Sequence, residues 1–269
     1  MTIWQSIILG IVQGVTEFLP ISSSGHIVLL QRIWHISGDS LLFVTFLHLG
    51  TLIAVIWALR REVLELIHRP LSWKGIMILT ALVPTAVIGV LFEEWFEGLF
   101  QSGVTVGFEF VITGVVLWWM DSVSAGKKDI MDMTVPDALW IGALQGAAIM
   151  PALSRSGLTI AGGLWRGLNR NTAGRFSFLL SIPAILGATL VELDDMFEHK
   201  AQVMHSVSWS PILIGTLAAI VAGYISVKWT LWLIRTSRMR FFAIYAWVIA
   251  AFILSDQLFF HHWFPPLLH

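Results

Sequence analysis

The sequence is poor in cysteine and in charge. None of its 269 residues is cysteine, which excludes disulfides, thiol catalysis and thiolate metal sites. Charged side chains make up 12% of the chain, about half of the ~25% found in soluble domains. A net charge of −1 without any basic run argues against a nucleic-acid partner. Hydrophobic residues account for 57% and the mean hydropathy is +0.80, which is typical of a polytopic membrane protein.

Several familiar sequence signals are also missing. The N-terminal segment has neither a basic region nor a small-residue cleavage site, so we expect no removable signal peptide. There is no glycine-rich phosphate loop, no His-x-x-x-His pair and no aspartate cluster. The chain does contain fourteen tryptophans, a supply that suits a protein with two membrane–water interfaces.

Long apolar segments predict an all-α integral membrane protein. Two of these segments, residues 3–34 and 138–165, are interrupted by polar residues and predict re-entrant helical hairpins. The charged segment 121–137 is the predicted connecting loop. The predicted membrane spans are residues 41–59, 76–92, 104–120, 176–191, 212–234 and 241–254.

The two polar interruptions belong to an internal repeat. Three matches share an offset of 132 residues: Gln13-Gly14 with Gln145-Gly146, Gly25 with Gly157, and Phe46-Leu47 with Phe178-Leu179. Such agreement indicates a duplication. Repeat one covers residues 1–120 and repeat two residues 138–269, each with one broken hairpin and three spans. Because three is odd, the second repeat must have inverted topology, which brings the two breaks together near the membrane midplane.

The basic residues predict the orientation. If both hairpins return to their own side, one face collects Arg60, Arg61, Arg69, Lys74, Lys127, Lys128, Arg166, Arg170, Arg175, Arg235, Arg238 and Arg240. The opposite face receives mainly acids: Glu93, Glu94, Glu97, Asp194, Asp195 and Glu198. The positive-inside rule makes the basic face cytoplasmic, so we expect both termini and the open end of the first hairpin outside.

The first polar motif, residues 13–26, holds most of the candidate chemistry. Pro20 should end the incoming helix, because proline lacks an N–H and crowds the preceding turn. The outgoing helix would then begin with serine caps and free N–H groups, which favour an anion. We therefore expect phosphate binding by Ser22, Ser24 and Gly25, although at least one serine of the run serves only as a cap.

Four residues of this motif are candidates for catalysis or metal binding. Ser23 and His26 have a spacing that allows a nucleophile–base pair; His26 could instead accept the phosphoryl group itself or be a packing residue. Glu17 could bind a hard divalent cation, act as a base or form an ion pair. Gln13, one turn earlier on the same face, could add an oxygen ligand or bond to the broken backbone.

The second polar motif is centred on Arg155, in an otherwise apolar neighbourhood. Its forked guanidinium fits phosphate oxygens, and a charge inside the membrane is functional by default. The alternatives are snorkelling to the headgroups or pairing with Glu17. The neighbouring residues expected at the phosphate, with helix packing as the alternative, are Ser154, Ser156, Gly157 and Thr159. The other histidines have no partner pattern, so we assign His48 to structure and leave Glu109 without a role.

The two motifs resemble those of the undecaprenyl-diphosphate phosphatase family, whose members confer bacitracin resistance. Residues 13–26 are similar to that family's Glu-rich first motif, and residues 154–160 to its Pro-Gly-x-Ser-Arg-Ser-Gly-x-Thr motif. The resemblance covers nearly the whole chain. It implies an enzyme of the bacterial plasma membrane that removes the terminal phosphate of undecaprenyl diphosphate. It also implies a divalent cation, magnesium or calcium, and a site open to the periplasm.

The resemblance also implies roles for single residues. Glu17 would serve the metal or acid–base work, Ser23 and His26 the phosphoryl transfer, and Arg155 the diphosphate. We choose Ser23 as the nucleophile and His26 as its base. Two positions depart from the pattern: Gln13 stands where the family often has a second glutamate, and Ala152 replaces the glycine after the motif proline.

A transporter or flippase of a phosphorylated lipid or anion is the alternative function, because inverted repeats with broken helices are also transporter architecture. The Ser–His pair favours the enzyme, since transport needs no nucleophile. The expected partners are a polyprenyl diphosphate lipid and the membrane. The sequence does not fix the oligomeric state, and a homodimer is compatible with it.

Overall fold

The computed structural model of the chain describes residues 1–36, 40–123, 126–199, 208–236 and 239–267. These residues form helices and turns, with one isolated β-bridge between Lys128 and Leu168. The helices are α1 (Ile3–Phe18), α2 (Ser23–Ile33), α3 (Ser40–Ala58), α4 (Arg60–His68), α5 (Trp73–Leu91), α6 (Glu93–Ser102), α7 (Val106–Ser122), α8 (Val135–Ala147), α9 (Arg155–Trp165), α10 (Arg170–His199), α11 (Trp209–Arg235) and α12 (Arg240–Ser255). A short 3₁₀-helix (Ile130–Asp132) precedes α8, and a π-helical turn (Asp256–Phe260) follows α12.

The predicted all-α membrane fold is confirmed. By length and hydropathy, five described segments could cross a membrane: Leu41–Ala58, Trp73–Leu91, Arg170–Asp194, Trp209–Arg235 and Arg240–Phe260. The helices α6 and α7 pass the same test together but are bent by 107°. The division into two repeats at residues 120 and 138 stays a prediction. The predicted loop 121–137 is not entirely irregular, because a capping box of Thr134 and Asp137 starts α8 at Val135.

Two helices were not anticipated, α4 and α6. Both are short and amphipathic, and a search for long apolar runs overlooks such segments. Helix α4 has nine residues and begins directly after the apolar helix α3. Its first two residues, Arg60 and Arg61, are charged. Helix α6 ends at Gly103, whose left-handed φ of 65° allows the chain to turn sharply into α7.

Both predicted breaks follow from local capping signals. Helix α1 ends two residues before Pro20, and the side chain of Ser22 starts α2 by accepting the Gly25 N–H at 3.3 Å. In the second hairpin, the Ser154 hydroxyl starts α9 by accepting the Gly157 N–H at 3.1 Å. Each hairpin is therefore two half-helices joined at a serine cap.

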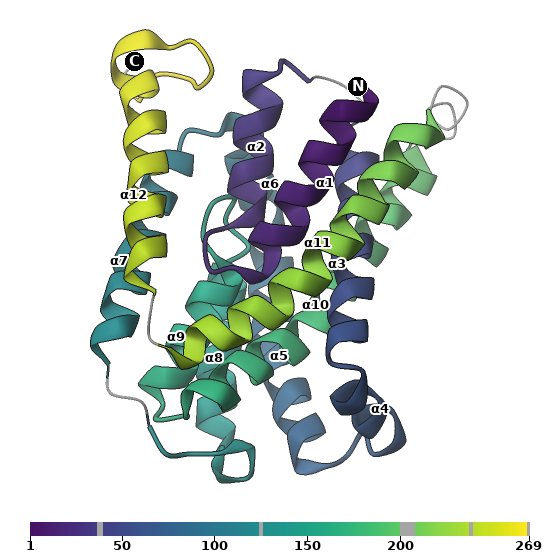
Figure 1. Ribbon diagram of the computed structural model, residues 1–269, viewed down its shortest axis with the longest axis vertical. Helices are drawn as coiled ribbons and strands as arrows, with labels where there is room; N and C mark the ends of the chain where they lie inside the picture. Colours follow the sequence, from purple (N-terminus) through teal and green to yellow (C-terminus); the bar gives the residue numbers. More distant parts are fainter. Residues whose placement is uncertain (37–39, 124–125, 200–207, 237–238, 268–269) are drawn as a thin grey trace.

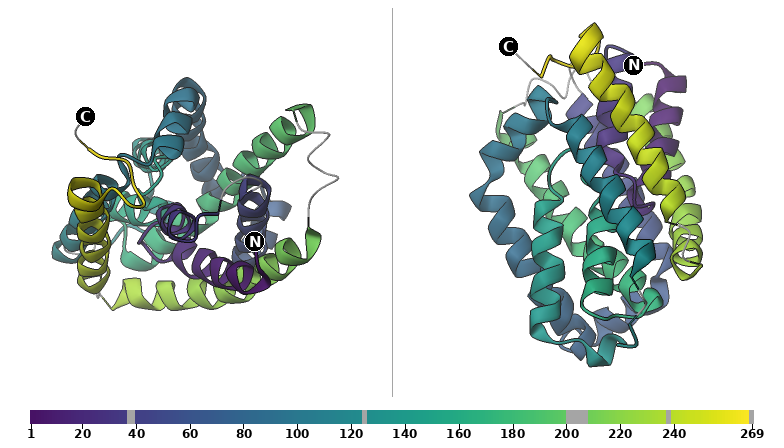
Figure 2. Two further views of the ribbon diagram at one scale, coloured as in Figure 1. Left: turned by 90° about the horizontal axis from the view of Figure 1, so that it is seen from above. Right: turned by 90° about the vertical axis from the view of Figure 1, so that its left-hand side faces the viewer.

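The two hairpins enter the bundle from opposite ends. In Figure 1, α1 and α2 lie at the end that carries both termini, whereas α8 and α9 lie at the other end. Their tips touch in the middle, where the Ser156 hydroxyl donates to the Leu19 carbonyl at 3.2 Å. Figure 2 shows α7 and α12 side by side at one edge, and α11 crosses the bundle obliquely in Figure 1.

The first helix of each hairpin packs against a span of the other half. Helix α1 lies along α11, and α8 lies along α5. The contact is close because glycines lie in it: a Cβ at Gly10 would be 2.2 Å from the Gly215 carbonyl oxygen, and one at Gly142 would be 1.9 Å from the Ala81 oxygen. Small residues let membrane helices approach this closely.

We predict that Gly142→Ala lowers the melting temperature of the detergent-purified protein by several degrees. The added methyl group would overlap the backbone of α5, and overpacking of this kind typically costs about 1–3 kcal/mol. Gly187→Ala in α10 is the matched control, because a Cβ there meets nothing within 4 Å. That variant should melt at or slightly above the wild-type temperature, since alanine favours a helix by up to ~1 kcal/mol. Equal melting temperatures for both variants would contradict the packing described.

The end of the bundle opposite the termini carries α4 and the segment that precedes α8 (Figure 1), which include Arg60, Arg61, Lys127 and Lys128. Asp137 is fully buried there and binds Arg166 Nε at 2.7 Å and Lys128 Nζ at 3.0 Å. Burial alone would raise the pKa of Asp137, but these bonds and the Thr134 N–H lower it to about 2. These bonds join the open end of the second hairpin to the preceding segment.

Candidate active site

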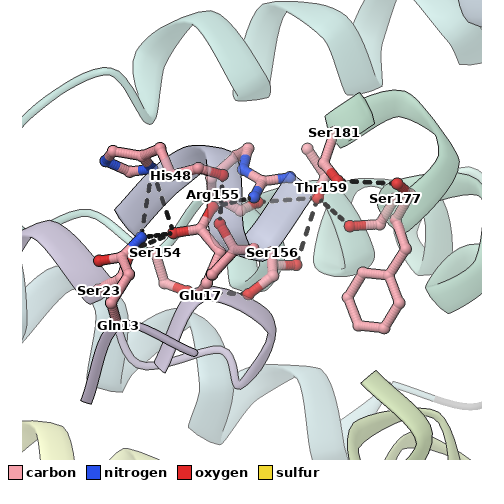
Figure 3. Close-up of polar contacts among 12 residues, drawn as sticks. Gln13, Glu17, Ser23, His48, Ser154, Arg155, Ser156, Thr159, Ser177 and Ser181 are labelled. Carbon is pink, nitrogen blue, oxygen red and sulfur yellow. Dashed lines mark hydrogen bonds and ion pairs between the residues drawn. The ribbon is translucent and has the colours of Figure 1, made fainter. Parts of the chain in front are cut away.

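The tips of the two hairpins converge on the Glu17 carboxylate (Figure 3). Glu17 lies in the last turn of α1 and is 7% exposed. Its Oε1 forms an ion pair with Nη2 of Arg155. Its Oε2 accepts the Ser23 hydroxyl at 2.5 Å and Nε2 of Gln13 at 2.9 Å. Arg155, which lies 138 positions after Glu17 in the sequence, thus binds the same buried carboxylate as Ser23 and Gln13.

Ser23 and Arg155 occupy equivalent places, since each is the first residue of the helix after a break. The N-termini of α2 and α9 therefore both point into the site, and their free N–H groups favour negative charge. In the second hairpin the position equivalent to Glu17 is Ile149, at the offset of 132 residues. The first hairpin thus supplies the carboxylate and hydroxyl of the site, and the second hairpin supplies the guanidinium.

Two buried polar atoms at the site have no hydrogen-bond partner among the residues that the structure describes. They are Nη1 of Arg155 and Oε1 of Gln13. A buried donor of a charged group is costly to leave unpaired, so such an atom indicates a place for a ligand. Arg155 can therefore keep Glu17 on Nη2 and offer Nη1 to an anion.

The structure does not bring Ser23 and His26 together as the predicted nucleophile–base pair. The His26 ring turns back along α2, where Nδ1 lies 2.5 Å from the Ser22 carbonyl oxygen. Its Nε2 lies 2.7 Å from the Tyr245 hydroxyl of α12. Both ring nitrogens are engaged, and the Ser23 hydroxyl donates to Glu17 instead. The group placed to accept the Ser23 proton is Glu17.

The other predicted phosphate ligands mostly hold the hairpin tips in place. The Ser22 and Ser154 hydroxyls cap their helices, and Ser156 bonds to Leu19. Thr159 donates to the Arg155 carbonyl at 2.8 Å and lies 2.6 Å from the Ser177 hydroxyl. These contacts match the packing alternative.

The remaining small residues of the tips differ in their surroundings. A Cβ at Gly25 would meet the Phe110 ring at 2.7 Å, and one at Gly157 would meet the Ser154 hydroxyl at 3.1 Å, so both glycines allow close packing. Ser24 is half-buried and makes no side-chain hydrogen bond within the part of the chain that the structure describes. Ala152 does not have a positive φ, so its turn does not require the glycine of the family pattern.

The sequence missed His48, which comes from α3. Its Nδ1 lies 3.2 Å from Nε2 of Gln13 and 3.9 Å from Oε2 of Glu17. The sequence offers no local signal for this, because α3 reaches the site only through helix packing. Glu109 was also left without a role; it is buried and accepts the Ala152 N–H, which anchors the turn before Arg155.

The residues of the site fit a divalent cation only together with other ligands. Among the described residues, no group of three His, Cys, Asp or Glu side chains could hold a metal ion. Gln13 directs its nitrogen toward Glu17, but its buried oxygen has no partner within the described part of the chain. Mg²⁺ often takes one carboxylate and completes its shell with phosphate oxygens and water. The Glu17 carboxylate and Gln13 oxygen suit such an ion.

Comparison with known proteins identifies the family of the chain. Residues 6–252 match the protein family described as bacitracin resistance protein BacA. The chain belongs to the BacA family.

A relative in Carboxydothermus hydrogenoformans named undecaprenyl-diphosphatase is 46% identical over 257 residues, which are 96% of this chain and 98% of the relative. Undecaprenyl-diphosphatase 4 of Bacillus cereus is 43% identical over 253 residues, covering 94% of this chain and 96% of the relative. The undecaprenyl-diphosphatase of Halothermothrix orenii is 42% identical over 256 residues, covering 94% and 98%. The sequence-based assignment to this family is confirmed.

Proposed function

We propose that the protein hydrolyses undecaprenyl diphosphate to undecaprenyl phosphate and inorganic phosphate. This reaction returns the lipid carrier to cell-wall synthesis and would confer bacitracin resistance. The names of its BacA relatives support this substrate. The observation that carries the proposal is the junction of the hairpins, where a serine hydroxyl, a carboxylate and a buried arginine with an unpartnered Nη1 meet between two helix N-termini.

The proposed reaction begins at Ser23. Glu17 accepts the hydroxyl proton through Oε2 while Oγ attacks the terminal phosphorus. The bond from that phosphorus to the bridging oxygen breaks, and undecaprenyl phosphate leaves with the proton that Glu17 returns to its oxygen. Water then attacks the phosphoserine and gives a proton to the Glu17 carboxylate. The bond from phosphorus to Ser23 Oγ breaks, Glu17 returns the proton to Oγ, and inorganic phosphate is released.

Charge stabilisation supplies most of the rate in phosphoryl transfer. Nη1 of Arg155 and the N–H groups that begin α2 and α9 would bind the oxygens of the transferring group. A cation held by Glu17 and Gln13 would neutralise further phosphate charge when it is bound. His26 has no step in this scheme, because its ring faces away toward Tyr245.

We further propose that the charged end of the bundle faces the cytoplasm of a bacterial cell. The site would then open to the periplasmic side, and both termini would lie outside. Helix α4, which begins at Arg60 directly after an apolar helix, lies at that end in Figure 1, and its basic residues support this orientation. The homodimer stays a prediction.

Single cysteines test this orientation, because the chain has none of its own. Gln101 is exposed near the end that carries the termini, and Glu65 is 54% exposed near the other end. An impermeant maleimide should label Gln101→Cys in intact spheroplasts and Glu65→Cys only after permeabilisation. Labelling of Glu65→Cys in intact spheroplasts would contradict the orientation.

Release of phosphate tests the proposed function. Purified protein in detergent should release inorganic phosphate from undecaprenyl diphosphate, and EDTA should reduce that release. A protein that binds the lipid without releasing phosphate would favour the transporter alternative. The Ser23–Glu17 hydrogen bond argues against that alternative, since transport needs no activated hydroxyl.

A further inference from the structure

The turn that presents Ser23 is strained. Ser22, its neighbour, has φ 68° and ψ 107°, a positive φ that serine rarely adopts. Such a conformation persists only when surrounding contacts hold it, and it often lies beside a functional group. The geometry of Ser23 toward Glu17 therefore depends on what fixes Ser22.

One side chain holds the backbone of this turn from the outside. The carbonyl oxygen of Ser22 can only accept, so the His26 Nδ1 at 2.5 Å must carry the hydrogen and donate it. The His26 ring is 6% exposed and packs edge-on against Phe110, with ring centroids 5.3 Å apart. The ring is therefore fixed in place as well as bonded.

A second residue sets the proton arrangement of that ring. With its hydrogen on Nδ1, neutral His26 has an acceptor at Nε2, and the Tyr245 hydroxyl at 2.7 Å is placed to donate to it. The two rings stack in parallel, with an interplanar angle of 1° and centroids 5.6 Å apart. Tyr245 is 40% exposed on α12, an apolar helix, where an unbonded hydroxyl would be unfavourable.

We infer that Tyr245 and His26 are positioning residues for Ser23. Tyr245 donates to His26 and keeps the hydrogen on Nδ1; His26 donates to Ser22 and holds the strained turn. When the turn at Ser22 is held in this conformation, the Ser23 hydroxyl points at Glu17. The inference rests on the proposed function, in which Ser23 attacks the phosphorus, and assigns His26 no proton transfer to or from the substrate.

Two substitutions of His26 separate positioning from base catalysis. An asparagine amide can place an N–H where Nδ1 lies, whereas a glutamine amide reaches the position of Nε2. His26→Asn should therefore keep at least ten times the kcat of His26→Gln. Neither amide can act as a base, so equally inactive variants that remain folded would overturn the inference.

Tyr245→Phe tests the hydrogen bond from the Tyr245 hydroxyl to Nε2 of His26. Loss of one hydrogen bond should lower kcat by about 3- to 10-fold while KM stays unchanged and the melting temperature falls by only a few degrees. The ¹⁵N spectrum of His26, identified by its absence in His26→Asn, should show the ring losing its fixed Nδ1–H tautomer. Tyr224→Phe on α11 is the control, because that hydroxyl interacts with Lys228 and Arg60, neither of which belongs to the site. The control should leave kcat and the spectrum as in wild type.

These outcomes are distinct from failure of the proposed function. If Tyr245→Phe leaves both kcat and the His26 signals unchanged, the positioning inference is wrong even though the phosphatase is active. If the wild type releases no phosphate, the proposed function is wrong, and the ¹⁵N spectrum still shows whether Tyr245 sets the tautomer.

Discussion

Replacement of Ser23 by alanine is expected to lower kcat by roughly 10³- to 10⁶-fold, the range for the loss of a serine nucleophile. The Ser23 hydroxyl, which we propose as the nucleophile, donates to Glu17 at 2.5 Å. Affinity for the lipid should change little, because Arg155 and the two helix N-termini remain. Phosphate release and lipid binding, measured on the same detergent preparation, separate the two effects.

Ser24→Ala is the matched control for this prediction. The same hydroxyl is removed one residue later, from a half-buried side chain that makes no hydrogen bond to the described residues. Its kcat should stay within a few-fold of wild type. Near-normal turnover in Ser23→Ala, or an equal loss in both variants, would remove Ser23 from the role of nucleophile.

Replacement of Arg155 by alanine is expected to lower kcat by about 10³-fold, comparable with the loss of an arginine that stabilises phosphoryl-transfer charge. Arg155→Lys retains the charge but loses the fork, and one ammonium cannot hold Glu17 and a phosphate in the same geometry. That variant should lose about 10- to 100-fold. Initial rates at saturating lipid measure both effects.

Stability provides an independent check on Arg155. Removing it leaves the Glu17 carboxylate buried without its partner, which typically costs about 3–5 kcal/mol. The double variant Glu17→Gln/Arg155→Ala should recover part of the melting temperature and none of the activity. Full activity in Arg155→Ala would exclude the proposed anion site, and an unchanged melting temperature would exclude the buried ion pair.

The parts of the fold that sequence predicted correctly depend on local signals. The hydropathy of a segment such as residues 212–234 depends only on the residues in it. The serine caps at Ser22 and Ser154 likewise involve residues only three positions apart. Short amphipathic helices such as α4 escaped because they contain no long apolar run. Local sequence therefore predicted five candidate spans and both breaks, whereas the predicted span 104–120 passes the test of length and hydropathy only together with α6.

The site was predicted less completely, because its contacts are long-range. The spacing of Ser23 and His26 suggested a nucleophile–base pair. In the structure His26 bonds to Tyr245, 219 residues away, and Ser23 donates to Glu17. His48 reaches Gln13 through the packing of α3, which no motif encodes. The two polar motifs predicted which residues lie at the junction of the hairpins. Tertiary packing decides which of these residues form hydrogen bonds with one another.

The most direct test of the account is to find where the phosphoryl group is attached during turnover. Purified protein is mixed with undecaprenyl diphosphate labelled in its terminal phosphate, quenched within one turnover, digested and analysed by mass spectrometry. We predict an acid-stable phosphoserine at Ser23, absent from Ser23→Ala. Label on His26, which would be acid-labile, or phosphate release with no labelled peptide at any quench time, would contradict a serine nucleophile activated by Glu17.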